Sequence, residues 1–216
     1  MYRAVLFDLD GTLLNTFEDL ADTMNSVLAA HEFPTHAVDA YRYFIGNGMP
    51  TLVARAIPAA QRESGLLDGY VRELRAAYAE KWNVKTCPYD GVPEMLDNLT
   101  TRGLTMSVLS NKPQDMTVQC VREYFPGTVF ASVRGHSAAA PLKPDPAAAL
   151  DIVRLMGCTP EECAFLGDTA IDMSTATAAG MLPVGALWGF RDEKELREAG
   201  AKHLISRPAH LIDLIV

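Results

Sequence analysis

The chain has 216 residues, of which 49% are hydrophobic and 21% charged, so it can bury one sizeable core with a smaller second domain but not several large ones. Its formal net charge of -8 excludes a general attraction for nucleic acid or for an anionic membrane surface, and neither partner is expected. No apolar run approaches the roughly 20 residues that span a membrane, and no signal-peptide pattern precedes the first apolar run, so the cytoplasm is the expected compartment.

The first predicted element is a short apolar strand at residues 4–7, with the sequence Ala-Val-Leu-Phe. Apolar side chains at successive positions suit a strand that is buried on both faces, as in a parallel sheet. The strand ends in Asp8-Leu9-Asp10-Gly11-Thr12, where acidic residues and a glycine interrupt the apolar pattern. This segment is either an exposed turn or the edge of a functional site.

The next stretch is predicted to be helical, because apolar side chains recur at helical spacing over residues 17–28 and again over residues 68–82. Thr16 and Asp19 resemble a capping box in which Asp replaces Glu. A glycine-rich turn, Ile45-Gly46-Asn47-Gly48, lies between the two helices. No convincing strand pattern occurs in this stretch, which favours a small helical insert.

Strand and helix patterns alternate in the rest of the chain. The predicted strands are residues 104–109, 129–133, 164–166 and 182–187, and the predicted helices are residues 92–101, 113–124 and 145–157 and a stretch that ends at Gly180. Such alternation implies parallel pairing with right-handed crossovers, and therefore a doubly wound α/β core of the Rossmann-like kind. The core is expected at residues 1–14 and 86–216, with a helical cap domain inserted at residues 15–85.

Four aspartates lie at or just beyond predicted strand ends: Asp8, Asp10, Asp168 and Asp172. Ligands of doubly wound sheets bind at this edge, so the four carboxylates are expected to converge there. Two like charges 4 Å apart repel by about 4 kcal/mol at an effective dielectric constant near 20. A divalent cation would neutralise such a group, and oxygen-only ligands favour Mg²⁺ over Zn²⁺. The alternative for Asp168 and Asp172 is capping of the helix that follows.

Candidate phosphate ligands flank these carboxylates. Thr12 offers a hydroxyl beside backbone amides that could grip an anion, and Ser110 and Asn111 follow a predicted strand. Lys143 precedes a proline, which favours extended backbone and gives its side chain a stiff base. The alternatives are helix capping for Ser110 and Asn111 and an ordinary surface position for Lys143.

Together these groups suit phosphoryl transfer to a carboxylate. An anionic nucleophile is repelled by a phosphate dianion, and a divalent cation with a lysine ammonium offsets that repulsion. A second carboxyl group must protonate the leaving alkoxide and later activate water, and anionic neighbours raise the pKa of such a group. Asp8 and Asp10 could divide these two roles.

Four segments, Phe7–Leu13, Ser110–Lys112, Lys143 and Gly167–Asp172, resemble the four motifs of the haloacid dehalogenase superfamily in their usual order. The segments Pro141–Pro146 and Trp188–Arg191 are similar to those of its phosphoglycolate phosphatase-like branch. Where the first motif often continues to an Asp-Ser pair, this chain has Asn15 and Thr16.

This resemblance implies a role for each motif residue. Asp8 would be the nucleophile that forms an aspartyl-phosphate, and Asp10 the general acid and base, whose main-chain carbonyl also binds the metal. Asp8 and Asp168 would ligate Mg²⁺ through their carboxylates, with Asp172 supporting the metal shell. The phosphate would be held by Ser110 and Lys143, the latter also neutralising Asp8.

The resemblance further implies a magnesium-dependent phosphatase that hydrolyses a small phosphorylated metabolite similar to phosphoglycolate, as a monomer or homodimer. The alternatives are a sugar-phosphate mutase of the β-phosphoglucomutase type, a metal-free dehalogenase, and a non-catalytic binding module. The cap would select the substrate, with Gly46–Gly48 either in a closing loop or in a plain turn.

The four cysteines, Cys87, Cys120, Cys158 and Cys163, form no CxxC pair and show no zinc-ligand spacing. We expect mostly buried thiols in a reducing compartment rather than metal ligands.

Overall fold

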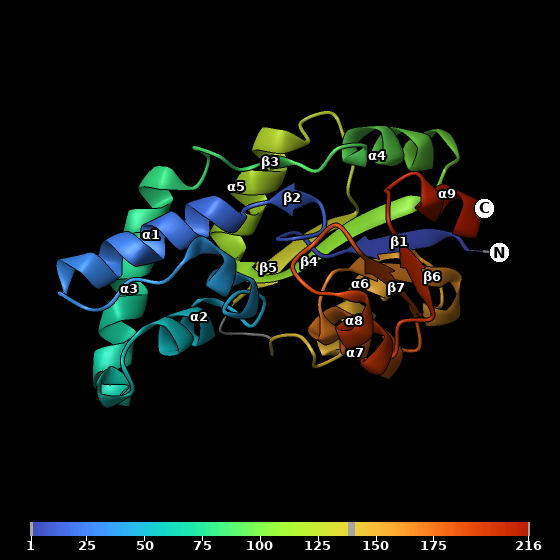
Figure 1. Ribbon diagram of the computed structural model, residues 1–216. Coiled ribbons are helices and arrows are strands. Elements are labelled where there is room, and N and C mark those ends of the chain that lie inside the picture. Colours follow the sequence, from blue (N-terminus) through green and yellow to red (C-terminus); the bar gives the residue numbers. More distant parts are fainter. Residues whose placement is uncertain (1, 138–140, 216) are drawn as a thin grey trace. The chain divides into compact units, whose positions relative to one another are not determined.

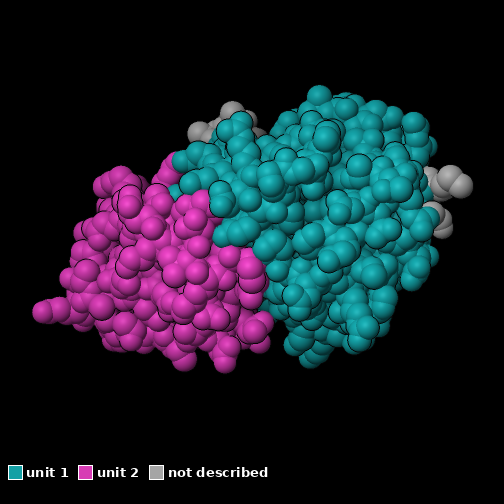
Figure 2. Space-filling model, turned by 90° about the horizontal axis from the view of Figure 1, so that it is seen from above, with its two compact units in different colours: residues 1–14, 88–216 teal, residues 15–87 magenta. Residues whose placement is uncertain are grey.

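The computed structural model describes residues 2–137 and 141–215, and the chain folds into two compact units. The first unit comprises residues 1–14 and 88–216, and the second comprises residues 15–87 (Figure 2).

The chain passes between the two units in two short strands that pair with each other, β2 (Leu14–Asn15) and β3 (Cys87–Pro88). Neither strand is apparent in the sequence, because each has only two residues. The second unit ends at Cys87, whereas the sequence predicts that the cap ends at residue 85.

A six-stranded sheet in which every neighbouring pair is parallel forms the centre of the first unit. In spatial order its strands are β5 (Ser132–His136), β4 (Thr105–Pro113), β1 (Ala4–Phe7), β6 (Cys163–Gly167), β7 (Leu182–Ala186) and β8 (His203–Ile205). β1 and β6, at the middle of the sheet, are buried along their whole length, as their apolar sequences predict. The expected doubly wound α/β fold is confirmed.

Helices cover both faces of this sheet (Figure 1). They are α4 (Val92–Thr101), α5 (Gln114–Tyr124), α6 (Ala147–Met156), α7 (Ala170–Ala179), α8 (Glu193–Glu198) and α9 (His210–Ile215), with a 3-10 turn, η3 (Pro160–Glu162), before β6. Right-handed crossovers place α4 and α5 on one face and α6, α7 and α8 on the other, because the strand order reverses at β1. Doubly wound sheets bind their ligands where the strand order reverses, which here is at the carboxyl ends of β1 and β6.

One hydrophobic core cluster lies between the sheet and the α6–α7 face. Leu6 of β1 and Phe165 of β6 pack with Ile152 of α6 and Ala176 of α7, and all four are completely buried. Burying a side chain of the size of Leu or Phe contributes about 1.5–3 kcal/mol, so this cluster fixes the strand ends that carry the site.

Two strand predictions in this unit need correction. β5 begins at Ser132 rather than at residue 129, and Val129 is 79% exposed. β4 continues through Ser110, Asn111 and Lys112, which the sequence analysis places after the strand. The pairing of β4 with β5 is irregular between Leu109 and Pro113, so these polar residues lie where the regular ladder is interrupted.

The second unit is helical, as expected. Its elements are α1 (Phe17–Ala30), η1 (Val38–Tyr43), α2 (Met49–Ala56), η2 (Ala59–Gln61) and α3 (Ser64–Lys81), and both α1 and α2 pack against α3. The sequence analysis does not predict α2, which follows the glycine-rich turn directly.

The capping box expected at Thr16 and Asp19 is wrong. Within the described residues the Thr16 side chain makes no capping hydrogen bond. The buried Asp19 carboxylate instead accepts hydrogen bonds from the backbone N–H groups of Lys85 and Thr86 and from the Thr86 hydroxyl, at 2.8–3.0 Å. Asp19 thus ties the start of α1 to the end of the second unit.

All four cysteines are free thiols. Cys120 and Cys163 are buried as expected, whereas Cys87 is exposed. In the part of the chain that the structure describes, no helix combines the length and apolar character needed to cross a membrane.

Candidate active site

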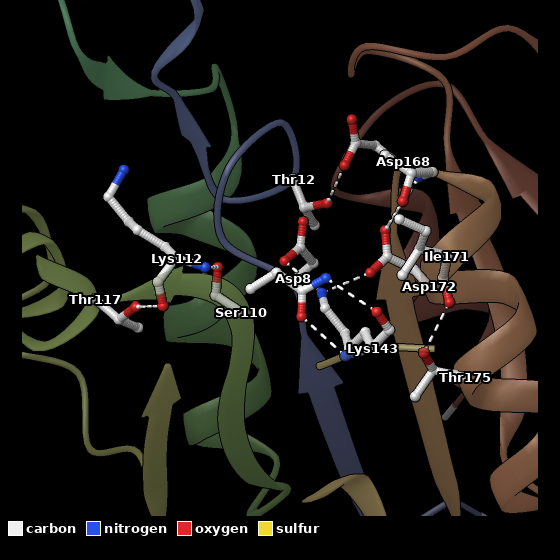
Figure 3. A network of polar contacts seen from close by, with 12 residues as sticks. Asp8, Thr12, Ser110, Lys112, Thr117, Lys143, Asp168, Ile171, Asp172 and Thr175 are labelled. Carbon is white, nitrogen blue, oxygen red and sulfur yellow. Dashed lines mark hydrogen bonds and ion pairs between the residues drawn. The ribbon is translucent and has the colours of Figure 1, made fainter. Parts of the chain in front are cut away.

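The polar residues singled out in the sequence come together at the carboxyl edge of the sheet (Figure 3). Asp8 directly follows β1, Asp168 directly follows β6, and Asp172 lies in the first turn of α7. Lys143 is in the loop between β5 and α6, the connection that returns across the sheet. The site therefore lies at the edge of the sheet where the strand order reverses.

Three buried carboxylates form the centre of the site. Asp8, Asp168 and Asp172 are 6%, 0% and 1% exposed, and each offers an oxygen within 4.8 Å of the others. Lys143 Nζ lies 2.6 Å from Asp8 Oδ1 and 2.7 Å from Asp172 Oδ1. With all three carboxylates ionised, the Lys143 ammonium balances one of three negative charges in a buried site, and the Arg191 guanidinium also acts on Asp168.

The donor set fits a hard divalent cation. Uncompensated charge in a protein interior is costly, and a divalent ion would supply the missing positive charge. The ligand atoms available are carboxylate oxygens only, which suits Mg²⁺.

The acid–base properties of the group reflect this shortage of positive charge. Burial raises the pKa of Asp8 well above its ordinary value, and the neighbouring Asp172 and Asp168 raise it further against the opposing effect of Lys143. Burial, and then Asp172, raise the pKa of Asp168 to about 7, although hydrogen bonds from Phe190 and Thr12 oppose the shift. An ion that replaced the protons would lower both pKa values.

Lys143 itself stays charged. Burial alone lowers the pKa of this ammonium, but Asp172 and Asp8 together outweigh burial and bring the pKa above its ordinary value. Its backbone is held by Asn111, whose Oδ1 accepts from Lys143 N at 2.9 Å and whose Nδ2 donates to Lys143 O at 3.1 Å. Asn111 was singled out as a phosphate ligand, and that role stays a prediction; in the structure its amide positions Lys143.

Asp172 caps the helix that follows, as one of the two interpretations of the sequence has it, and it also contacts Lys143; its support of a metal shell stays a prediction. Its Oδ2 accepts from Thr169 N at 3.1 Å and from Thr169 Oγ1 at 2.7 Å, as one half of a capping box at the start of α7. Its Oδ1 binds Lys143. One oxygen therefore caps the helix while the other belongs to the site.

Asp168 is held through both of its oxygens. Thr12 Oγ1 donates to Oδ1 at 3.1 Å, and Phe190 N donates to Oδ2 at 2.7 Å. Thr12, expected near phosphate, thus orients a carboxylate in this structure, and phosphate binding by Thr12 stays a prediction.

Asp10 lies apart from the three-carboxylate group. Its Oδ1 accepts from Lys112 Nζ at 3.0 Å, in an ion pair whose side chains are 14% and 3% exposed, respectively. The buried Ser110 hydroxyl accepts from Lys112 N at 3.2 Å. The carboxylate proposed for proton transfer therefore has its own counter-ion, separate from Lys143.

The family of haloacid dehalogenase-like hydrolases matches residues 5–186, which is most of the chain and includes Asp8, Lys143, Asp168 and Asp172. The chain belongs to this family.

Named relatives of this hydrolase are phosphatases. A phosphoglycolate phosphatase from Pseudomonas putida is 33% identical over 192 residues, covering 87% of this chain and 70% of that protein. One from Haemophilus influenzae is 28% identical over 220 residues, covering 99% of this chain and 98% of that protein. A crystal structure from Lactobacillus delbrueckii has a TM-score of 0.93 at 27% identity, covering 100% of this chain and 98% of that chain.

Two residues of the hydrolase's site were not identified from the sequence. Lys112 was noted only as a neighbour of Asn111, although a lysine in an otherwise buried, polar strand end is a signal for a buried counter-ion. Phe190 acts through its backbone N–H, which no sequence pattern reveals.

Proposed function

We propose that this hydrolase cleaves small phosphomonoesters in a magnesium-dependent reaction with Asp8 as the nucleophile, and that 2-phosphoglycolate is the first substrate to test. The observation that carries the proposal is the contact of Lys143 with both Asp8 and Asp172 inside a group of three buried carboxylates. The phosphoglycolate phosphatases among the relatives support the choice of substrate.

Mg²⁺ would be held by Asp8, Asp168 and the main-chain carbonyl of Asp10. Asp172 would support this ligand shell. Bound Mg²⁺ would supply positive charge to the oxygens of the transferring phosphoryl group. Lys143, fixed by Asn111, would hold the same group from the side of Asp8.

In the first step an Asp8 carboxylate oxygen bonds to phosphorus while the ester P–O bond breaks, and the departing alkoxide takes a proton from Asp10. In the second step water attacks the phosphorus of the aspartyl-phosphate and gives its proton to Asp10. Inorganic phosphate then leaves and the Asp8 carboxylate is restored. For both transfers Asp10 exchanges its contact with Lys112 for one with the reacting oxygen.

The test compares the wild type with Asp8→Asn, and with Asp97→Asn as a control in an exposed position of α4. Phosphate release from 2-phosphoglycolate is measured with Mg²⁺ and with EDTA, and acid-quenched wild type is analysed by mass spectrometry for a phosphoryl group on Asp8. We expect turnover only in the wild type and the control with Mg²⁺. Turnover by folded Asp8→Asn would overturn the assignment of the nucleophile.

The alternatives predict different products. A mutase would convert one glucose phosphate into another in a single turnover without net release of phosphate. A dehalogenase would release halide from 2-haloacids in the presence of EDTA. A binding module would release phosphate from no ester despite correct folding.

A further inference from the structure

The segment Trp188–Arg191, which follows β7, lies directly against Asp168. Phe190 N donates to Asp168 Oδ2, and the Trp188 indole Nε1 donates to the backbone carbonyl of Thr12 at 3.0 Å. The segment thus contacts the Asp168 carboxylate directly through Phe190 and indirectly through Trp188, which binds Thr12.

Gly189 shows how closely this segment approaches. A Cβ atom at that position would lie 2.3 Å from Asp168 Cβ and 2.5 Å from the carbonyl oxygen of Gly11, distances that no side chain tolerates. A Cβ at Gly11 would likewise lie 2.3 Å from Asp168 Oδ2. Backbone from the loops after β1 and β7 therefore packs on Asp168 from two directions.

Thr12 joins the two loops. Its carbonyl receives the Trp188 indole N–H, while its hydroxyl donates to Asp168 Oδ1. The orientation of Asp168 consequently depends on where Thr12 lies, and Trp188 holds Thr12 from the opposite side.

We propose that Trp188 is a positioning residue for the metal site, acting through Thr12 to fix the orientation of the Asp168 carboxylate. This inference rests on the magnesium site of the proposed function. Groups that hydrogen-bond to metal ligands typically change metal affinity by about 10- to 100-fold when they are removed. Trp188 contacts Asp168 only through Thr12, so the effect of removing its N–H should be smaller. We expect Mg²⁺ binding to weaken about fivefold.

The main experiment measures Mg²⁺ binding by isothermal titration calorimetry in the wild type, Trp188→Phe and Trp82→Phe. The control replaces the other tryptophan of the chain, which is buried in the second unit. We expect the Kd for Mg²⁺ to rise about fivefold in Trp188→Phe and to stay unchanged in Trp82→Phe. The melting temperatures of the metal-free variants are measured alongside, because a merely structural role would lower Tm without changing the Kd.

A double-mutant cycle with Thr12→Val tests the route through Thr12. If Trp188 acts through this residue, Trp188→Phe has little further effect on the Kd once the hydroxyl is gone. Independent, additive effects would overturn the proposed route, and an unchanged Kd in Trp188→Phe would overturn the inference while leaving the proposed function intact. Failure of the wild type to bind Mg²⁺ would overturn the proposed function itself.

A second measurement avoids any dependence on the folding of Trp188→Phe. In Trp82→Phe, Trp188 is the only tryptophan, and its fluorescence is expected to change on titration with Mg²⁺. Emission that stays constant while calorimetry shows binding would overturn the coupling between Trp188 and the site.

Discussion

Asp19 in the second unit and the Asp8–Asp168–Asp172 group in the first are both buried acidic positions, yet they differ in what surrounds them. Among the described residues, the hydrogen-bond donors to the Asp19 carboxylate are uncharged: two backbone N–H groups and a hydroxyl. The other three carboxylates offer oxygens within 4.8 Å of one another, and the Lys143 ammonium contacts two of them, Asp8 and Asp172.

This difference separates a structural carboxylate from a functional one. Burial with matched hydrogen-bond donors stabilises the charge of Asp19 and fixes the chain around it. Burial, together with the neighbouring like charges, raises the pKa of Asp8 and Asp168, and the proposed Mg²⁺ would offset those charges.

The largest effect is expected for Lys143→Met. The substitution keeps an unbranched, slightly shorter side chain but removes the ammonium that contacts Asp8, so kcat/KM for 2-phosphoglycolate should fall by about 1000-fold at saturating Mg²⁺. Lys194→Met, at an exposed position of α8, serves as the control and should retain wild-type activity. Wild-type activity in Lys143→Met would contradict the assigned role of the ammonium.

Asp19→Asn should destabilise the protein by about 2 kcal/mol, because one amide N–H₂ would face donors that now meet a carboxylate oxygen. Urea denaturation measures the loss, and Asp22→Asn on the exposed side of α1 is the control. Magnesium affinity should be unchanged. A weaker Mg²⁺ affinity in Asp19→Asn would contradict the assignment of a purely structural role to Asp19.

Asp168→Asn should have the opposite effect on stability. Removing one of three like charges should raise the free energy of unfolding of the metal-free protein by about 2 kcal/mol at pH 8, while Mg²⁺ binding is lost. Urea denaturation in EDTA and calorimetry with Mg²⁺ measure the two effects. A metal-free variant less stable than the wild type would show that losing the hydrogen bonds from Phe190 and Thr12 outweighs relief of the repulsion.

The stability of the metal-free protein should also depend on pH, because Asp168 is ionised beside two other carboxylates at high pH. The pKa of Asp168 is about 7 in the folded protein against an ordinary 3.8, so between these values the folded state binds more protons than the unfolded state. The free energy of unfolding should therefore fall by about 2 kcal/mol from pH 5 to pH 8 relative to Asp168→Asn. Denaturation curves in EDTA at both pH values test this, and a difference that rises with pH would contradict it.

The sequence predicts the regular part of this molecule well. The apolar runs that became β1 and β6 placed Asp8 and Asp168 at neighbouring strand ends, because parallel strands share one carboxyl edge. Short elements were missed: β8 has three residues and α8 and α9 have six each, too few to show a period.

Partners between distant segments were the least predictable part of the site. Asp19 has the residue type of a helix cap, but its hydrogen-bond donors come from Lys85 and Thr86 at the other end of the second unit. Lys112 likewise meets Asp10 only because β4 pairs with β1. Tertiary contacts of this kind override local patterns, and a single sequence does not record them.

The two oxygens of the Asp172 carboxylate have different partners, and this couples the thermal stability of α7 to catalytic turnover. Because one oxygen caps α7 and the other orients Lys143, fraying of the first turn of this helix would release the ammonium as well. Heating would then inactivate the enzyme through a local opening before the sheet melts. Any substitution that strengthens the start of α7 would extend the temperature range of catalysis without touching a reacting atom.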